Sequence, residues 1–344
     1  MPVPKNKPIA PRFSRRAPDG DNGRLVPESS GYAKTQAKLE LVTELLGTRD
    51  IRELCLALDI KPSKKRGQNF VTDPGTVRRI AAGASLSSAE VVLEIGPGLG
   101  SLTLALLETG ARVIAVEIDS RLAAALPTTV RVHEGLVENL YVSCADALHL
   151  DSTSRVMTDT GWPPPVALVA NLPYNVATPI LLHILEVMPE INRAQVMVQA
   201  EVADRLVARV GDSAYGAPSV KLAWWGCARR AFGVSRQVFM PIPNVDSTVV
   251  EFRRESPRLF SGVESLNASE MEALRQRSFE FITAAFGMRR KTLRQSLARL
   301  CGSPDTAAGL LEKAGIDPGL RAENLGVADF AYLARVESTE TVGK

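Results

Sequence analysis

The sequence is poor in the residues that build metal centres and disulfide frameworks. Its 344 residues include only four cysteines and three histidines. The cysteines form no C-x-x-C pair and lie far apart, at Cys55, Cys144, Cys227 and Cys301. Scattered thiols fit a reducing cytoplasm, and no metal site is predicted. No apolar run approaches the roughly 20 residues of a membrane-spanning helix, so no membrane contact is predicted either.

The sequence also has little excess of positive over negative charge. Lysine and arginine number 41 against 38 acidic residues, which gives a formal net charge of +3. A general polycation attraction to nucleic acid is therefore excluded. Any such binding has to depend on local clusters of basic residues.

The length of the chain allows about two domains and a tail. Residues 1–47 are rich in Pro, Gly, Arg and Ser and predict a basic, largely disordered extension. An organellar transit peptide is the alternative, which the prolines and acidic residues disfavour. Residues 48–255 predict an α/β domain, and residues 256–340 predict a smaller all-helical C-terminal domain. Its helices are expected near 270–285, 288–300, 304–314 and 327–336.

A glycine-rich loop follows a short apolar strand at Val91–Ile95. It contains Gly96, Gly98 and Gly100, and an apolar helical stretch begins after it. Glycines allow the backbone to approach a ligand closely, and the following helix offers free N–H groups. The spacing G-x-G-x-G differs from the dinucleotide pattern G-x-G-x-x-G, which disfavours a nicotinamide cofactor without excluding it.

Three further apolar strands end in polar side chains. Glu117 follows the second strand and can accept both hydroxyls of a ribose, and Asp146 follows the third and can accept an adenine amine. Asn171 follows the fourth. Ligands bind at the carboxyl edge of such a sheet. The order of the four tips predicts an adenosine-type cofactor beside a second, amine-bearing base.

The fourth strand leads into Asn171-Leu172-Pro173-Tyr174. The Asn171 amide oxygen and a nearby carbonyl, expected to be that of Leu172, can accept the N–H groups of an exocyclic amine. Pro173 fixes the backbone, and Tyr174 offers a ring on which a base can stack. Taken alone, the motif is better explained as an Asx-type turn with Tyr174 in the core, and the rest of the chain reverses that preference.

This order of motifs resembles the class I S-adenosylmethionine methyltransferases, and more closely the ribosomal RNA adenine dimethyltransferase family. The resemblance runs from Lys64 to Arg335. It includes a G-Q-N-F motif at residues 67–70, followed by Val71 where the family usually has Leu, and an F-x-P-x-P-x-V-D-S loop at residues 239–247. Ala217-Pro218 stands where the family more often has Arg-Leu.

The resemblance implies a Rossmann-like sheet, S-adenosylmethionine as cofactor, and dimethylation of two adjacent adenosines near the 3′ end of 16S rRNA. The partner would be the small ribosomal subunit or its precursor, and a cytoplasmic monomer is expected. The expected catalytic residues are Asn171, Leu172, Pro173, Tyr174 and Phe239, although Phe239 can equally be a core anchor. The expected cofactor-binding residues are Asn69, Val71, Gly96, Glu117, Asp146 and Asn171.

Two basic clusters flank the expected base pocket. The first is Lys64, Lys65 and Arg66, and the second is Arg289, Arg290, Lys291 and Arg294. A basic cluster is usually a solvated face, but here phosphate contact is favoured. The second cluster is predicted to lie on one helix, with no acidic residue between Phe281 and Arg299. The expected RNA-binding residues are Lys64, Lys65, Arg66, Arg289, Arg290, Lys291 and Arg294.

Two alternatives fit the same sequence. A related enzyme could modify large-subunit rRNA and confer macrolide resistance, but that family more often has Ile in place of Leu172 and lacks the 239–247 form. A non-catalytic assembly or transcription factor could reuse the fold, although intact Gly96, Glu117, Asp146 and Asn171 weigh against lost catalysis.

Overall fold

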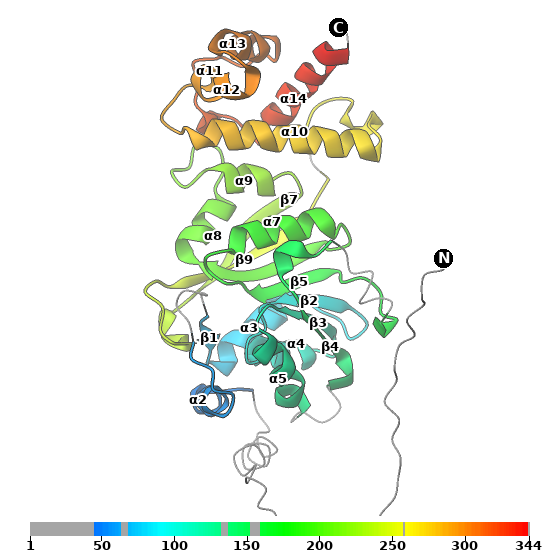
Figure 1. Ribbon diagram of the computed structural model, residues 1–344, viewed down its shortest axis with the longest axis vertical. Coiled ribbons are helices and arrows are strands. Elements are labelled where there is room, and N and C mark those ends of the chain that lie inside the picture. Colours follow the sequence, from blue (N-terminus) through cyan, green and yellow to red (C-terminus); the bar gives the residue numbers. More distant parts are fainter. Residues whose placement is uncertain (1–44, 63–67, 132–136, 152–158, 257–258, 343–344) are drawn as a thin grey trace, which may run out of the picture.

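The computed structural model describes residues 45–62, 68–131, 137–151, 159–256 and 259–342 (Figure 1). Most of the expected extension at residues 1–47 lies outside the described residues. The first basic cluster, Lys64, Lys65 and Arg66, lies outside them as well.

A mixed seven-stranded sheet forms the centre of the described chain, in the order β4-β3-β2-β5-β6-β9-β7. The first five strands in this order are parallel, and β9 is antiparallel to both of its neighbours, β6 and β7. A short ribbon pairs β1 with β8. The strands are β1 (Phe70–Val71), β2 (Val91–Ile95), β3 (Arg112–Glu117), β4 (Leu140–Cys144), β5 (Ala167–Asn171), β6 (Arg193–Gln199), β7 (Gly226–Val234), β8 (Phe239–Met240) and β9 (Ser247–Arg254).

Helices cover both faces of this sheet, as a Rossmann-like fold requires. The side chains of a strand alternate between the two faces. Leu93 therefore contributes to the core under α7, whereas Val92 contributes to the core under α3 and α4. The helices around the sheet are α2 (Thr48–Ala57), α3 (Pro74–Gly83), α4 (Ser101–Leu107), α5 (Ser120–Arg131), α7 (Ala177–Val187), α8 (Ala200–Val207) and α9 (Ala217–Leu222). Pro218 occupies the first turn of α9, where it removes no helical hydrogen bond.

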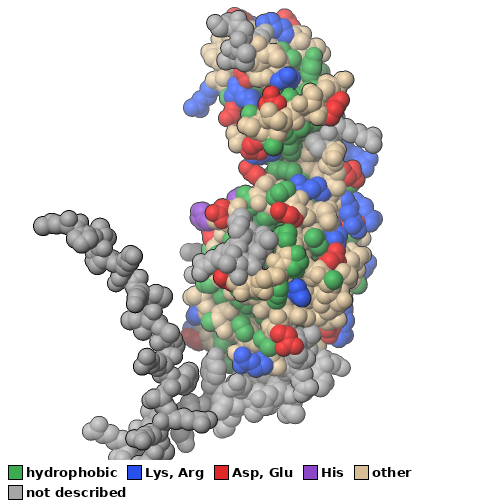
Figure 2. Space-filling model, turned by 90° about the vertical axis from the view of Figure 1, so that its right-hand side faces the viewer, with side chains coloured by type: hydrophobic (Ala, Val, Ile, Leu, Met, Phe, Trp, Pro, Cys, Tyr) green, Lys and Arg blue, Asp and Glu red, His purple; other side chains and the backbone are tan. Residues whose placement is uncertain are grey.

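A helical region follows the last strand and forms the upper end of the molecule in Figure 1. Its helices are α10 (Ala268–Gly287), α11 (Leu293–Ser296), α12 (Ala298–Cys301), α13 (Pro304–Lys313) and α14 (Val327–Val342). Among the helices that the structure describes, none is long and apolar enough to cross a bilayer. Acidic and basic side chains are interspersed on the face shown in Figure 2, in line with the small net charge.

The single helix expected at 288–300 is wrong. Residues 288–292 form a turn, and the short helices α11 and α12 follow it. The cause is a contact with a distant loop. The backbone N–H groups of Leu293 and Arg294 donate to the carbonyls of Leu320 and Pro318, at 2.7 and 3.1 Å, instead of to the preceding turn.

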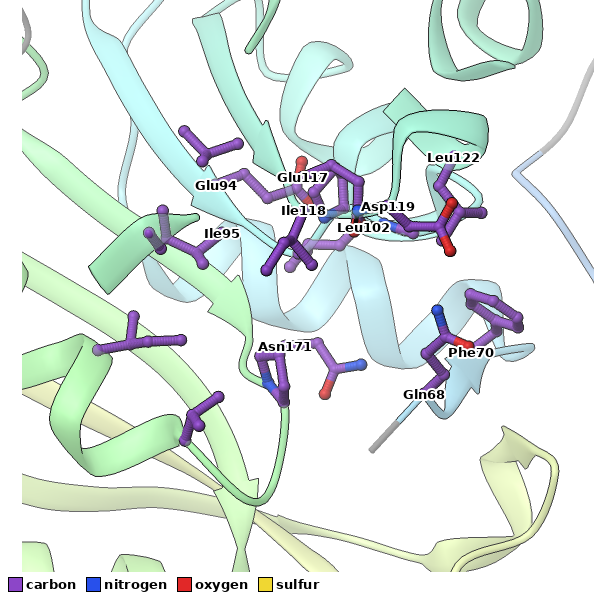
Figure 3. A pocket seen from close by; sticks show the side chains of 18 of the residues that line it. Gln68, Phe70, Glu94, Ile95, Leu102, Glu117, Ile118, Asp119, Leu122 and Asn171 are labelled. Atoms are coloured by element: carbon purple, nitrogen blue, oxygen red, sulfur yellow. Dashed lines mark hydrogen bonds between the residues drawn. The ribbon is translucent and has the colours of Figure 1, made fainter. Parts of the chain in front are cut away.

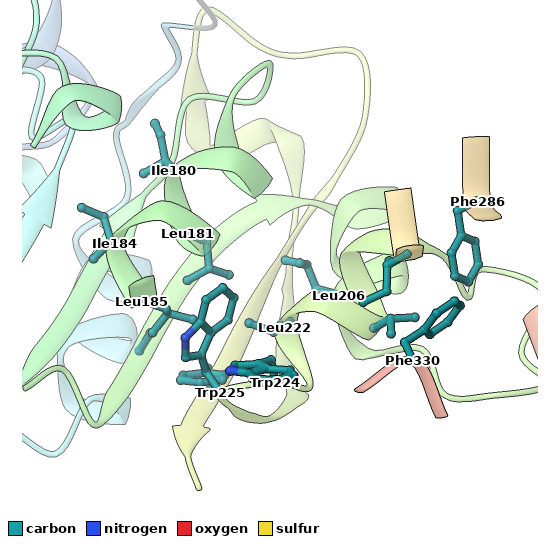
Figure 4. Packing of buried hydrophobic residues seen from close by; sticks show 14 of the residues in the cluster. Ile180, Leu181, Ile184, Leu185, Leu206, Leu222, Trp224, Trp225, Phe286 and Phe330 are labelled. Atoms are coloured by element: carbon teal, nitrogen blue, oxygen red, sulfur yellow. The ribbon is translucent and has the colours of Figure 1, made fainter. Parts of the chain in front are cut away.

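One hydrophobic core continues from the sheet into the helical region (Figure 4). Phe279 of α10 makes edge-on contacts with Trp224 and Trp225, at centroid distances of 6.0 and 5.3 Å. The buried Arg275 stacks on Phe279 and pairs with Glu186 of α7 at 2.6 Å. The helical region is therefore packed firmly against the sheet, which fixes the distance between its surface and the sheet edge.

Candidate active site at the carboxyl edge of the sheet

A cavity of about 500 Å³ opens at the carboxyl ends of the parallel strands (Figure 3). The chain leaves β2 toward β3 on one side, and β5 lies on the other side, so the strand order reverses at this point. Open α/β sheets bind ligands at such a switch point. The structure brings the four predicted strand tips together in the lining of this cavity: Gly96, Glu117, Asp146 and Asn171.

The glycine-rich loop adopts backbone conformations that favour glycine. Gly96, Gly98 and Gly100 have φ values of 70°, 59° and 98°. A Cβ on Gly98 would lie 2.9 Å from Cε1 of Phe70, and a Cβ on Gly96 would lie 3.7 Å from Cδ of Pro173. The loop is thus held between the G-Q-N-F segment and the Asn171 turn, with its backbone facing the cavity.

Glu117 holds this loop from the tip of β3. Its two carboxylate oxygens accept N–H groups from Gly98, at 3.1 Å, and Asp119, at 3.0 Å. Burial raises the pKa of Glu117, and these backbone hydrogen bonds partly oppose the rise. Each carboxylate oxygen has a further lone pair, so the group can still accept two hydroxyls.

Asp146 lies just beyond the tip of β4 and is held by local contacts. One carboxylate oxygen accepts the backbone N–H of Leu148 at 2.9 Å and caps the 3-10 turn Ala147–His149. The other lies 3.2 Å from Nδ1 of the exposed His149. These contacts position the carboxylate at the cavity wall, where it can accept an amine.

Asn171 has an oriented side chain with an unused acceptor. Its Nδ2 donates to the backbone carbonyl of Asn69 at 3.2 Å. Its Oδ1 is buried and has no hydrogen-bond partner within the described chain. A buried acceptor without a partner destabilises a protein by about 1–3 kcal/mol. An N–H donor that displaced the atoms covering this oxygen would satisfy it.

The rest of the turn is divided between cavity and core. Pro173 lines the cavity, whereas the Leu172 side chain is buried and its N–H donates to Met197. Asn69 and Val71 also lie in the cavity wall. The half-buried Tyr174 is hydrogen-bonded through its hydroxyl to Oγ of Ser247 at 2.8 Å. Burial raises the pKa of this phenol.

The Phe239 side chain lies in the core, which is the alternative to base stacking that the sequence left open. The Phe239 side chain is 2% exposed and is absent from the cavity lining. The pairing of Phe239 with Val71 between β8 and β1 places its ring in the core. It meets Tyr174 edge-on, with a centroid distance of 6.5 Å and an angle of 73°. Phe239 therefore supports the ring of Tyr174, which is likewise absent from the cavity lining.

Glu94 is a site residue that the sequence reasoning missed. It is fully buried in β2, lines the cavity and accepts the Thr103 hydroxyl at 2.7 Å. Burial raises its pKa to about 8, and the neighbouring Glu117 charge adds to the rise. The sequence does contain a signal for this residue, because Glu94 is the one charged residue in the otherwise apolar strand β2.

The second basic cluster lies in the helical region and is exposed, but it does not follow one helix. Three of its residues lie in the turn, and Arg294 lies in α11. Arg294 pairs with Asp305 at 2.6 Å, and Arg289 donates to the carbonyl of Tyr215 at 3.1 Å. Within the described chain, Arg290 and Lys291 form no ion pair.

Five parallel strands with an antiparallel pair, a glycine-rich loop at the switch point and carboxylates at the next two tips define a class I methyltransferase. The family model described as ribosomal RNA adenine dimethylase matches residues 60–337. The chain belongs to the ribosomal RNA adenine dimethylase family, as the motifs predict. It is thus an enzyme that dimethylates adenine in ribosomal RNA, and the non-catalytic alternative is set aside.

Relatives and solved structures agree with this assignment. Ribosomal RNA small subunit methyltransferase A of Thermobifida fusca is 51% identical over 84% of this chain and 95% of its own length. The crystal structure of a dimethyladenosine transferase from Plasmodium falciparum has a TM-score of 0.62 at 24% identity, over 79% of this chain and 98% of that chain. It supports the fold alone. The crystal structure of the 23S rRNA methyltransferase ErmE gives a TM-score of 0.52 at 28% identity, over 78% and 98%.

Proposed function

We propose that the chain dimethylates the exocyclic amines of two adjacent adenosines near the 3′ end of 16S rRNA, using S-adenosylmethionine. Its partner is the small ribosomal subunit or its precursor, and it acts as a cytoplasmic monomer. The 51% identity to a small-subunit methyltransferase, against 28% to a 23S enzyme, favours this substrate over the large subunit. The observation that carries the chemistry is the unpaired Oδ1 of Asn171 beside the glycine-rich loop.

The cavity fits the cofactor. Its volume of about 500 Å³ lies within the range of small-molecule sites. Glu117 would hold the ribose hydroxyls and Asp146 the adenine amine. The positive-φ backbone at Gly96 would lie against the ligand, with Asn69 and Val71 over it. When bound, S-adenosylmethionine supplies an electrophilic methyl group on a positively charged sulfur.

The Asn171 turn prepares the acceptor nitrogen. The lone pair of an adenine amine is delocalised into the ring, which makes it a poor nucleophile. Acceptance of its N–H groups by Asn171 Oδ1 and the Leu172 carbonyl concentrates the lone pair on nitrogen. The same two acceptors stabilise the positive charge that develops there during transfer.

Positioning accounts for the remaining catalysis. Tyr174 provides one face for the base, Phe239 and Ser247 hold that ring, and Pro173 fixes the turn. No general base is required, because the proton can leave to solvent after transfer. Holding donor and acceptor in line can contribute several kcal/mol to lowering the barrier.

The experiment that tests this function is mass spectrometry of rRNA after incubation of the enzyme with S-adenosylmethionine and unmodified ribosomal subunits. We expect dimethyladenosine at two adjacent positions of the small subunit. At saturating S-adenosylmethionine, the Asn171→Ala variant should lose methyl transfer by orders of magnitude. Methylation of the large subunit alone would overturn the proposed substrate.

A further inference from the structure

The loop between β8 and β9, residues 241–246, exposes apolar side chains at the surface. Ile242 is 57% exposed and Val245 is 42% exposed, and they are two of the few large apolar residues on the described surface. Exposed apolar side chains that stand close together often mark a contact site. We call residues 241–246 the proline loop, because Pro241 and Pro243 flank Ile242.

Both ends of the proline loop are attached to the candidate active site. Before the loop, Met240 pairs with Phe70, which lines the cavity. After the loop, Ser247 holds the hydroxyl of Tyr174. In Figure 1 the loop protrudes beside β1 at the left edge of the molecule. The proline loop, which carries Ile242 and Val245, therefore connects two segments that form the candidate active site.

The proline loop is held in one shape. Arg236 holds the loop through two hydrogen bonds. Its backbone N–H donates to a carboxylate oxygen of Asp246 at 2.9 Å, and the Arg236 guanidinium donates to the carbonyl of Asn244 at 3.0 Å. The carbonyl of Asp246 accepts the N–H of Ala200 at 3.1 Å. Two prolines further restrict the backbone. A fixed loop loses little conformational entropy when it inserts into a partner.

The chemistry of the loop suits contact with bases and not with phosphates. Residues 241–246 include no lysine or arginine, and the guanidinium of the adjacent Arg236 is held by the Asn244 carbonyl. Two apolar side chains are also too small an area for a stable protein partner. An enzyme that works on a stacked base has to extract it, and unstacking requires a few kcal/mol. In known DNA complexes, apolar side chains such as Ile and Pro insert between neighbouring bases and unstack them.

We propose that Ile242 and Val245 form a wedge that takes the place of the target adenosine in the RNA stack. The wedge packs against the neighbouring base while the adenosine occupies the pocket at Asn171 and Tyr174. This proposal rests on the proposed function, since it names how the same site receives its substrate. It adds two positioning residues that contact the RNA and take no part in methyl transfer.

The test compares two substrates. One is the unmodified small-subunit particle, and the other carries abasic nucleotides on both sides of a single target adenosine, so that no neighbouring base remains to unstack from. The double variant Ile242→Ser/Val245→Ser should lose about tenfold in kcat/KM on the first substrate. On the abasic particle it should match the unsubstituted enzyme. Leu56→Ser, at an exposed position in α2, is the matched control and should behave as the unsubstituted enzyme on both.

Cofactor affinity and the thermal midpoint of the double variant should stay unchanged, which separates a wedge from a folding defect. Equal losses on both particles, or no loss on the intact one, would overturn the wedge. The unsubstituted enzyme on the intact particle tests the proposed function by itself. Its failure there would reject the substrate, whereas a failure of the double variant to differ rejects only the wedge.

Discussion

The side-chain nitrogen of Asn171 donates to the backbone carbonyl of Asn69 at 3.2 Å, across 102 positions of the sequence. This contact determines which end of the amide is available, and it leaves Oδ1 as the unpaired acceptor. The G-Q-N-F segment and the turn that contains Asn171 therefore orient the Asn171 side chain together.

Asn171→Asp should inactivate the enzyme although it keeps an acceptor oxygen. The new oxygen would face the Asn69 carbonyl, and two acceptors at this distance repel each other. We expect single-turnover methyl transfer at saturating cofactor to fall by about 10²–10³-fold, as when an oriented transition-state hydrogen bond is lost. The control is Asn192→Asp, which makes the same chemical change just before β6 at the opposite edge of the sheet. Transfer within a fewfold of normal would show that the amide orientation is unimportant.

Tyr174 and Ser247 should act as a pair. Their hydrogen bond of 2.8 Å fixes the ring, and a neutral bond of this kind contributes about 1 kcal/mol. Tyr174→Phe and Ser247→Ala should each lower kcat a fewfold, and the double variant should be no worse than either. Tyr174→Ala, which removes the stacking face, should be far more damaging. Additive effects in this double-mutant cycle would mean that the hydroxyls act separately.

Glu94 should make stability fall as pH rises. Its carboxyl has an ordinary pKa of 4.5, and burial raises this to about 8 in the folded protein. Between these values the folded state binds a proton that the unfolded state has released, so each rise in pH weakens folding. The stabilisation that the protonated Glu94 carboxyl contributes is complete below about pH 4.5 and is lost as the pH rises through about 8.

Urea unfolding between pH 5 and 9 measures this effect. Glu94→Gln keeps the shape and a hydrogen-bond acceptor for Thr103 but cannot ionise, so the decline in unfolding free energy should become shallower. Some slope should remain, because the pKa of Glu117 is also raised. Glu108→Gln, which removes an exposed carboxylate paired with Arg78, is the control and should leave the slope unchanged. Parallel pH profiles for Glu94→Gln and the unsubstituted protein would contradict the assignment.

The sheet and its polar tips could be predicted from the sequence, because parallel strands place their carboxyl ends at one edge whatever packs around them. Features that depend on contacts between segments far apart in the sequence could not be predicted. The helix expected at 288–300 breaks because Leu293 donates to Leu320. Phe239 is buried because β8 pairs with β1, a ribbon of two residues per strand that no periodicity reveals. The burial of Glu94 follows from the strands and helices that surround β2.

The turn before α11 should contribute to RNA binding through Arg290 and Lys291. Both are exposed and form no ion pair with the described residues, whereas Arg294 is paired with Asp305. A cation without an acidic partner gives up no protein contact when it binds a phosphate. Arg290→Gln/Lys291→Gln should weaken binding to the small-subunit particle and lower the salt slope by about one unit for each lost phosphate contact.

Filter binding at several salt concentrations measures that slope, and Arg294→Gln is the matched comparison within the same cluster. We expect a smaller change for Arg294→Gln, because its charge is already partly compensated by Asp305 at 2.6 Å. Cofactor affinity should not change in either variant, since the turn lies in the helical region away from the cavity lining. An unchanged slope in the double variant would identify these two residues as an ordinary solvated surface. A loss of cofactor affinity would instead show that the turn supports the packing between the helical region and the sheet.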